Sequence, residues 1–238
     1  MRIKMIVSYD GSKFNGFQRL NNGSSVQNHI ELALSQLYKQ EVLVKGSGRT
    51  DAKVHANYQV VHFDVDKLID NLKNKLNRLI GPNIIVKKCE VVKDGFHARS
   101  SVKKKEYVYK INIGAYQSSL NDYFYQCPYK LDISLMKEAS KLFVGKHDFH
   151  NFVAGKRDNY FATIHSITFV KMFDKLEIHF IGTGFYRYMV RNLVGALLEV
   201  GKCKVSINVI EKMLNNPDEK QTLPTAIPEG LYLNKIWY

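Results

Sequence analysis

The sequence predicts an α+β fold in which antiparallel strands form a sheet and helices pack on one side of it. The first observation is the order of periodicities in residues 1–100, which runs strand, helix, strand, strand, helix, strand. This order is that of a ferredoxin-like unit. The second observation is that residues 101–238 again combine β-type runs with amphipathic helical stripes. A chain of 238 residues is long enough for two such halves.

The elements of the first half follow from local patterns. Ile3, Met5 and Val7 occupy alternate positions and predict a strand with an apolar face. A loop follows, and Ser25 is then a favourable N-cap for a helix with an apolar stripe that begins at Val26. The remaining predicted elements are strands at 41–45 and 58–65, a helix with Leu68, Leu72, Leu76 and Leu79 on one stripe that stops at Gly81 and Pro82, and a strand at 84–92.

The second half begins after a basic connector at residues 96–105. The predicted strands are 106–113, 163–173, 176–181 and 231–237, and the predicted helices cover 133–143, a stretch that starts near Gly184, and 207–214. Residues 114–130 are rich in aromatic and turn residues and fit either a long loop or an edge hairpin, and residues 145–159 are expected to form a basic loop. Arg187 and Arg191 are four residues apart and are expected to share a helix face.

Charge points to a polyanionic partner. Lys and Arg total 35 while Asp and Glu total 22, which gives a net charge of +13 and a pI near 9.5. Such a balance favours nucleic acid over a membrane surface. No run reaches the roughly 18 apolar residues that a membrane span needs, and the first residues lack the apolar core of a signal peptide.

Several kinds of chemistry are disfavoured by the motifs. The three cysteines lie far apart and form no CxxC pair, which indicates reduced thiols in a cytoplasmic protein. His147, Asp148 and His150 have no further ligand at a metal-like spacing, which argues against zinc. The chain contains neither a Walker loop nor a dinucleotide fingerprint, so no nucleotide cofactor is expected.

The most unusual stretch is GSGRTDAKVHA, residues 46–56, between two predicted strands. A turn between strands needs only Gly, Asn or Asp for its backbone, which accounts for the two glycines. It does not account for Arg49, Thr50, Asp51 and His55 together. Taken alone, the stretch fits either a polar surface turn or a site that uses a carboxylate.

This stretch resembles the GRTDAGVHA signature of the TruA-type tRNA pseudouridine synthases. SYDGSKFNGFQ is similar to the opening YDG and GWQ elements of that family, and SSVQNHIELAL to its TVQ helix. FHARSSVKKKEYVYKI, GKHDFHNF, FYRYMVRNLVGALLEVG and PEGLYLNKIWY then follow in the order of the family. Seven motifs in register make an accidental likeness implausible.

The resemblance implies two ferredoxin-like halves that share a continuous antiparallel sheet. Residues 1–100 would carry the catalytic loop, and residues 101–238 would supply the other catalytic side chains. It also implies a homodimer that binds tRNA and isomerises uridine to pseudouridine in the anticodon stem-loop. By resemblance, Asp51 is the catalytic aspartate, Tyr107 the stacking tyrosine, and Arg191 the arginine that pairs with the aspartate.

These implied roles agree with the needs of the reaction. The bond from C1′ to N1 breaks, the base turns, and C1′ joins C5, so no redox change occurs and no cofactor is required. An ionised carboxylate can add covalently or remove a proton, and a nearby guanidinium opposes its protonation. The uridine must be extruded at a cost of a few kcal/mol. The ring of Tyr107 can then stack on the freed base, and its hydroxyl is a candidate for proton removal from C5.

Basic side chains are expected to bind the RNA. Arg49 corresponds to the family's arginine beside the aspartate, and it would fill the space of the extruded base or hold a flanking phosphate. Lys53 replaces a family glycine, so it must either strain the turn, if that glycine has a positive φ, or add a phosphate contact. Such contacts make affinity fall steeply with salt. Further candidates for phosphate contacts are Lys103, Lys104, Lys105, Lys156 and Arg157.

The sequence leaves two alternative functions open. One is a pseudouridine synthase that acts on ribosomal RNA. The other is a non-catalytic RNA-binding module of the same fold. The complete set of Arg49, Asp51, Tyr107 and Arg191 argues against the second, because a module without catalysis has no need of a desolvated carboxylate.

Overall fold

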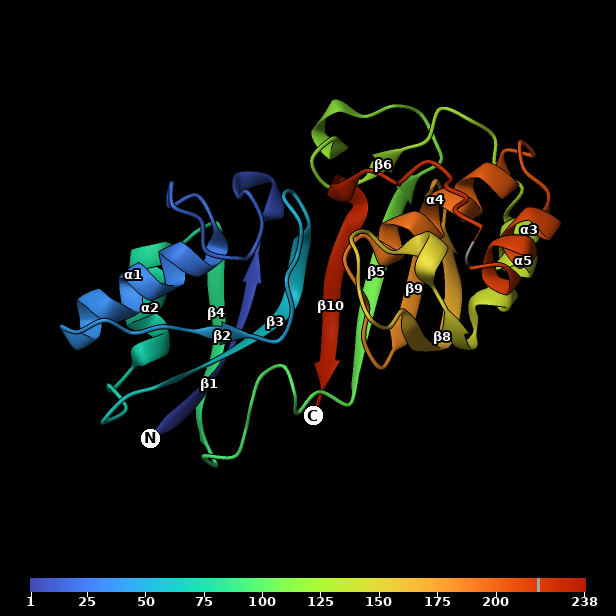
Figure 1. Cartoon of the computed structure of the whole chain (residues 1–238). Helices are drawn as coiled ribbons and strands as arrows, with labels where there is room; N and C mark the ends of the chain where they lie inside the picture. Colours follow the sequence, from blue (N-terminus) through green and yellow to red (C-terminus); the bar gives the residue numbers. More distant parts are fainter. Residues whose placement is uncertain (218) are drawn as a thin grey trace. The chain divides into compact units, whose positions relative to one another are not determined.

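The computed structural model describes residues 1–217 and 219–238, which form two compact units (Figure 1). Unit 1 comprises Met1–Lys103 and Tyr232–Tyr238, and unit 2 comprises Lys104–Leu231. Each unit combines mainly antiparallel strands with helices, so the predicted α+β class is confirmed. No helix in the described part of the chain combines the length and the apolar character needed to span a membrane.

The sheet of unit 1 has the strand order β4-β1-β3-β10. Its strands are β1 (Arg2–Tyr9), β3 (His55–Asp64), β4 (Ile84–Val92) and β10 (Leu231–Trp237). β1 is antiparallel to both β3 and β4, so that Ile3 lies opposite Phe63 on one side and Val91 on the other. β10 runs parallel to the beginning of β3, where Tyr232 faces His55. This pairing brings the beginning of β10 beside His55 and Ala56, the last two residues of the 46–56 stretch.

Helix α1 (Val26–Tyr38) forms as the sequence predicts. The side chain of Ser25 accepts a hydrogen bond from the backbone N–H of Asn28, which satisfies one of the unpaired donors of the first turn. The ring of Tyr38 packs edge-on against Phe63 of β3, which places α1 on the face of the sheet that carries Ile3.

Helix α2 (Leu72–Ile80) lies next to α1 (Figure 1) and differs from the prediction. Its buried residues are Leu72, Leu76 and Ile80, whereas Leu68 and Leu79 are 39% and 42% exposed. The predicted stripe was therefore wrong at both ends. Residues spaced by four positions lie above one another on a helix, so Ile80 rather than Leu79 continues the row from Leu72.

The strand predicted at 41–45 is also wrong in extent, since β2 covers only Lys45–Gly46. Val42 and Val44 do point into the core. Their backbone groups, however, are bound by side chains of α1. The hydroxyl of Ser35 accepts from the N–H of Val42, and Glu31 accepts from the N–H of Val44. The apolar residues do alternate, but the backbone N–H groups of Val42 and Val44 are bound by side chains of a helix and not by a neighbouring strand.

The connector after β4 packs on unit 1 around a buried histidine. The Nδ1 atom of His62 accepts a hydrogen bond from the N–H of Ala98 at 3.1 Å. The rings of Phe96 and His97 lie edge-on to His62 at 6.1 and 4.7 Å, and the hydroxyl of Tyr238 donates to the carbonyl of Ala98 at 2.7 Å. The connector therefore closes over the sheet of unit 1.

We expect unit 1 to lose stability in mild acid because of His62. Burial, followed by the charges of His97 and Arg2, lowers the pKa of His62 from 6.5 to about 4. The unfolded chain then binds a proton that the folded chain does not, so stability falls as pH drops from 6.5 towards 4. The expected loss between pH 7 and pH 4.5 is about 2 kcal/mol in urea unfolding. His62→Asn keeps a hydrogen-bond acceptor for the N–H of Ala98 and should reduce this loss of stability. An equal loss in the wild-type and His62→Asn proteins would assign the loss to other groups.

The sheet of unit 2 has the order β5-β9-β8-β7, and all three of these pairings are antiparallel. Its strands are β5 (Lys104–Asn112), β7 (Gly145–Asp148), β8 (Phe161–Met172) and β9 (Lys175–Gly182), with β6 (Tyr125–Gln126) parallel to β5. Its helices are α3 (Ile133–Ser140), α4 (Met189–Gly201) and α5 (Ile207–Asn215). α3 packs against both α4 and α5 (Figure 1).

Unit 2 contains three departures from the predicted elements. Residues 145–159 include β7 and a 3-10 turn at His150–Phe152 and are not simply a loop. The helix predicted over 133–143 is α-helical only to Ser140 and ends in a 3-10 turn. Arg187 and Arg191 do not share a helix face, because Tyr188 has a φ of 64° and α4 begins only at Met189.

Candidate active site

Thr50 anchors the 46–56 stretch, called the Asp51 loop below, to the core of unit 1. Its hydroxyl bonds with that of Tyr9 at 2.8 Å, and its carbonyl accepts from the N–H of Phe17 at 3.1 Å. Burial raises the pKa of Tyr9 to about 12, so this hydroxyl keeps its proton at neutral pH. With Thr50 directed inward, Arg49 is exposed and Asp51 is half-buried. The loop thus holds a carboxylate at the margin of the core.

The opening loop of the chain lies against the Asp51 loop. Gly16 has a φ of 93°, and a Cβ atom there would lie 2.9 Å from the carbonyl oxygen of Thr50 and 3.3 Å from the nitrogen of Ala52. Only glycine fits such an approach without displacing a backbone. The GFQ element of the sequence is therefore a structural neighbour of Asp51, although the two are far apart in the chain.

His55 links the Asp51 loop to two other segments of unit 1. Its Nδ1 accepts a hydrogen bond from the N–H of Gly11 at 3.0 Å, and its ring stacks on Tyr232 with centroids 4.5 Å apart. The carboxylate of Asp10 lies 3.4 Å from the same Nδ1 atom. These contacts give His55 a role in holding the loop.

Lys53 adopts a φ of 65°, the left-handed conformation that favours glycine. We expect Lys53→Gly to raise the free energy of unfolding by up to about 1 kcal/mol, because the left-handed penalty of a side chain exceeds the extra chain entropy of glycine. Urea unfolding of the two proteins measures this difference. Lys53→Ala keeps the penalty and serves as the control. A less stable Lys53→Gly protein would mean that contacts of the lysine side chain outweigh the strain.

Tyr107 lies in β5 of unit 2 and is buried. Its ring meets Phe185 edge-on with centroids 5.3 Å apart, and its register partner in β9 is Phe180. Contacts of this kind hold an aromatic side chain in one orientation. The ring of Tyr107 is therefore held in one orientation within unit 2.

Arg191 lies in the first turn of α4 and is held by a segment that precedes β10. Its Nε donates to the carbonyl of Ala226 at 2.8 Å, while its own carbonyl accepts from the N–H of Ala226 at 3.1 Å. Its guanidinium carbon lies 4.7 Å from the ring centroid of Tyr188. This pair of hydrogen bonds and the ring contact fix the direction of the guanidinium.

The other predicted RNA-binding residues have different degrees of exposure. Lys103, Lys156 and Arg157 are exposed, as phosphate contacts require, whereas Lys104 and Lys105 are half-buried at the beginning of β5. Arg49 and Lys53 are both exposed on the Asp51 loop.

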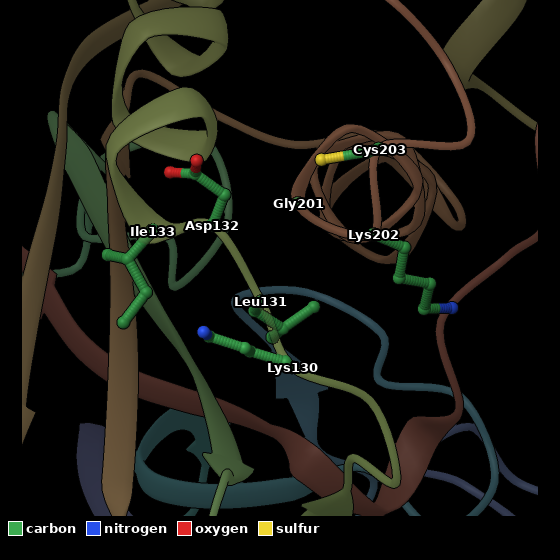
Figure 2. Close-up of a pocket in the computed structure, with 7 residues that line it drawn as sticks. All are labelled: Lys130, Leu131, Asp132, Ile133, Gly201, Lys202 and Cys203. Atoms are coloured by element: carbon green, nitrogen blue, oxygen red, sulfur yellow. The ribbon is translucent and has the colours of Figure 1, made fainter.

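A cavity of about 450 Å³ lies between the beginning of α3 and the end of α4 (Figure 2). Its lining residues are Lys130, Leu131, Asp132, Ile133, Gly201, Lys202 and Cys203. No residue that the sequence places in the site lines it. Over residues 1–217 and 219–238, no group of three His, Cys, Asp or Glu side chains is arranged to hold a metal ion.

Sequence reasoning missed three residues that support the site residues. Tyr9 binds Thr50 through its hydroxyl, and its only sequence signal is its place at the end of the first strand, within SYDG. Tyr188 contacts Arg191 through its ring and lies within the FYRYMVRN motif. Ala226 acts through its backbone carbonyl, which leaves no signal in the sequence because every residue has one.

Comparison with known proteins identifies the family. The sequence model of a family described as tRNA pseudouridine synthase matches residues 5–99 and 139–238, with Tyr107 in the gap between the two segments. tRNA pseudouridine synthase A of Geobacillus sp. (strain WCH70) is 41% identical, covering 100% of this chain and 98% of the relative. The proteins of the same name from Thermodesulfovibrio yellowstonii and Bacillus subtilis (strain 168) are 39% and 38% identical and are covered over 100% and 99% of their lengths.

Solved structures give a weaker comparison. The crystal structure of a Cbf5-Nop10-Gar1 complex is 14% identical, covers 82% of this chain and 54% of that chain, and has a TM-score of 0.33, which is too low to inform the assignment. The family model and the full-length relatives decide it. This chain belongs to the tRNA pseudouridine synthase family.

Proposed function

We propose that this protein isomerises uridine to pseudouridine in the anticodon stem-loop of tRNA, with Asp51 as the catalytic carboxylate. Membership of the family over the whole chain is the observation that carries the reaction and the substrate class. The anchoring of Thr50 supports the choice of Asp51, because it fixes the next residue at the margin of the core. A half-buried carboxylate can stay ionised in the free protein and lose its water when RNA covers it.

The proposed reaction is an isomerisation whose atoms balance without a co-reactant. Asp51 adds to C1′ or C6, or it removes a proton in an elimination route, and the bond from C1′ to N1 breaks. The base turns and C5 bonds to C1′, and Asp51 either leaves the carbon to which it added or returns the proton that it removed. C5 loses its proton and N1 ends with one, so the product has the composition of the substrate.

The other predicted residues take separate roles in this proposal. Residues 1–100 contribute the Asp51 loop, and residues 101–238 contribute Tyr107 and Arg191. Arg191 favours the ionised form of Asp51, and the ring of Tyr107 stacks on the extruded uracil. Arg49 fills the space of the extruded base or holds a flanking phosphate. The phosphates are contacted by the remaining basic residues, which are Lys53, Lys103, Lys104, Lys105, Lys156 and Arg157.

We also propose that the protein acts as a homodimer in the cytoplasm. The dimer rests on the resemblance to the family. The cytoplasm is supported by the cysteines, because Cys89, Cys127 and Cys203 are all free thiols in the structure.

Chemical mapping of pseudouridine in total RNA tests the function. Cells that contain the protein are compared with cells that lack it and with cells that carry Asp51→Asn. Loss of marks from tRNA anticodon arms in both altered strains is the expected result. Loss from ribosomal RNA would favour the ribosomal alternative, and unchanged marks everywhere would favour a non-catalytic RNA-binding module.

Tyr107→Phe separates the two proposed roles of Tyr107. The ring remains, so we expect tRNA affinity to be unchanged, while loss of the hydroxyl lowers kcat by about 10²-fold if it removes the C5 proton. Single-turnover rates and binding constants measure the two effects. Tyr116→Phe is the control, since Tyr116 is 69% exposed and its hydroxyl accepts from the side-chain amide of Asn121 at 2.7 Å. Full activity of Tyr107→Phe would limit Tyr107 to stacking.

A further inference from the structure

A cluster of aromatic and basic side chains lies around the beginning of β8 in unit 2. Phe161 is 51% exposed, and the Nζ of Lys146 lies 5.7 Å from the centroid of its ring. The hydroxyl of Tyr186 donates to the carbonyl of Phe161 at 2.8 Å. The guanidinium carbon of Arg157 lies 4.4 Å from the centroid of the Tyr186 ring. We call these four residues the Phe161 surface.

The loop that carries Arg157 is fixed by neighbouring groups. The hydroxyl of Tyr160 accepts from the N–H of Arg157 at 2.9 Å, and the Tyr160 ring stacks on His150 with centroids 4.3 Å apart. The N–H of Ala154 donates to the carbonyl of Arg187 at 3.1 Å. A ligand that binds here therefore meets rings and cations that are already in place, which lowers the entropic cost of binding.

The Phe161 surface continues towards a predicted catalytic residue within the same unit. Tyr186 is followed by Arg187 and Tyr188, and the guanidinium carbon of Arg187 lies 5.1 Å from the Tyr188 ring centroid. The Tyr188 ring also contacts the guanidinium of Arg191, which lies in the first turn of α4. Contacts between an aromatic ring and a cation therefore recur at Phe161, Tyr186 and Tyr188. Such rings can stack on bases while the cations contact phosphates.

We propose that the Phe161 surface binds unpaired nucleotides of the RNA that flank the target uridine. Phe161 stacks on a base, and Lys146 and Arg157 contact phosphates. The inference rests on the proposed function, because it takes RNA as the substrate. Exposed aromatic rings with adjacent cations are how proteins bind single strands. The net charge of +13 favours a polyanionic ligand such as RNA over a protein partner.

The test measures the binding of an unmodified tRNA transcript by fluorescence anisotropy at several KCl concentrations. Phe161→Ala should weaken binding by about 5- to 150-fold with an unchanged salt dependence, since stacking releases no counterions. Phe161→Trp should retain the affinity. Arg157→Gln should reduce the slope of log K against log salt by about 1. Phe173→Ala is the matched control, because Phe173 is 98% exposed in the β8–β9 turn of the same unit.

Two further measurements decide the inference. Phe161→Ala should not change the affinity for a fully paired RNA duplex, and it should raise KM for tRNA more than it lowers kcat. Wild-type affinity of Phe161→Ala for tRNA, or an equal loss for tRNA and duplex, would overturn the inference. A different result would reject the proposed function, namely that the wild-type protein makes no pseudouridine in tRNA. A wild-type protein that makes pseudouridine, together with an unaltered KM in Phe161→Ala, would reject the Phe161 surface alone.

Discussion

Asp51→Asn should lower the rate of pseudouridine formation by at least about 10³-fold and leave the fold and tRNA binding intact. The amide has nearly the shape of the carboxylate, but it can neither add to a carbon of the nucleotide nor accept a proton at neutral pH. The loop should keep its structure, because its anchors are the hydroxyl and carbonyl of Thr50. Single-turnover assays, thermal unfolding and tRNA binding measure the three properties.

Asp64→Asn provides a matched control for Asp51→Asn. Asp64 lies in unit 1 and pairs with Arg2 through two contacts of 2.8 Å, which lower the pKa of its carboxyl. Exposed pairs of this kind contribute less than about 1 kcal/mol, so the control should change stability slightly and kcat hardly at all. Retained activity in Asp51→Asn would show that another group supplies the carboxylate chemistry. Loss of folding in Asp51→Asn would give Asp51 a structural role instead.

The sequence predicts elements best where local signals decide the structure. β4 has the predicted bounds, and α1 begins after the predicted cap, because alternation and an N-cap hydroxyl act over a few residues. β7 escapes prediction because its residues, GKHD, have no apolar alternation and become a strand only through pairing with distant β8. The start of α4 was not predicted because it depends on the left-handed φ of Tyr188.

The candidate site shows the same division between local and distant causes. The residues proposed to carry the chemistry, such as Asp51 and Arg191, are visible because they stand in recognisable motifs. Their supports are not, because the hydroxyl of Tyr9 and the carbonyl of Ala226 reach them from distant positions in the chain. The positive φ of Lys53 is an intermediate case. The family motif has a glycine at this position, which raises the question of a positive φ. The structure answers it with a φ of 65° for Lys53.

Gly195→Ala should destabilise the protein by about 3 kcal/mol, which lowers Tm by roughly 6 to 12 °C. Helix propensity predicts the opposite sign, since Ala exceeds Gly by about 1 kcal/mol inside a helix. Packing decides otherwise, because a Cβ on Gly195 of α4 would lie 1.8 Å from the carbonyl oxygen of Pro224. That oxygen belongs to the backbone and cannot rotate away as a side chain does, so the segment at 224–226 must move.

Moving this segment should also lower the activity of Gly195→Ala, because the segment holds Arg191. Ala226 exchanges two hydrogen bonds with Arg191, and the hydroxyl of Thr225 donates to Asn192 at 2.7 Å. Gly95→Ala is the control, since a Cβ there meets nothing within 4 Å, and its stability should change by less than about 0.5 kcal/mol. Differential scanning calorimetry and single-turnover rates measure both effects. A more stable Gly195→Ala protein would show that helix propensity outweighs the contact with Pro224. The segment at 224–226 could then leave α4 at little cost, and Ala226 would not be what orients Arg191.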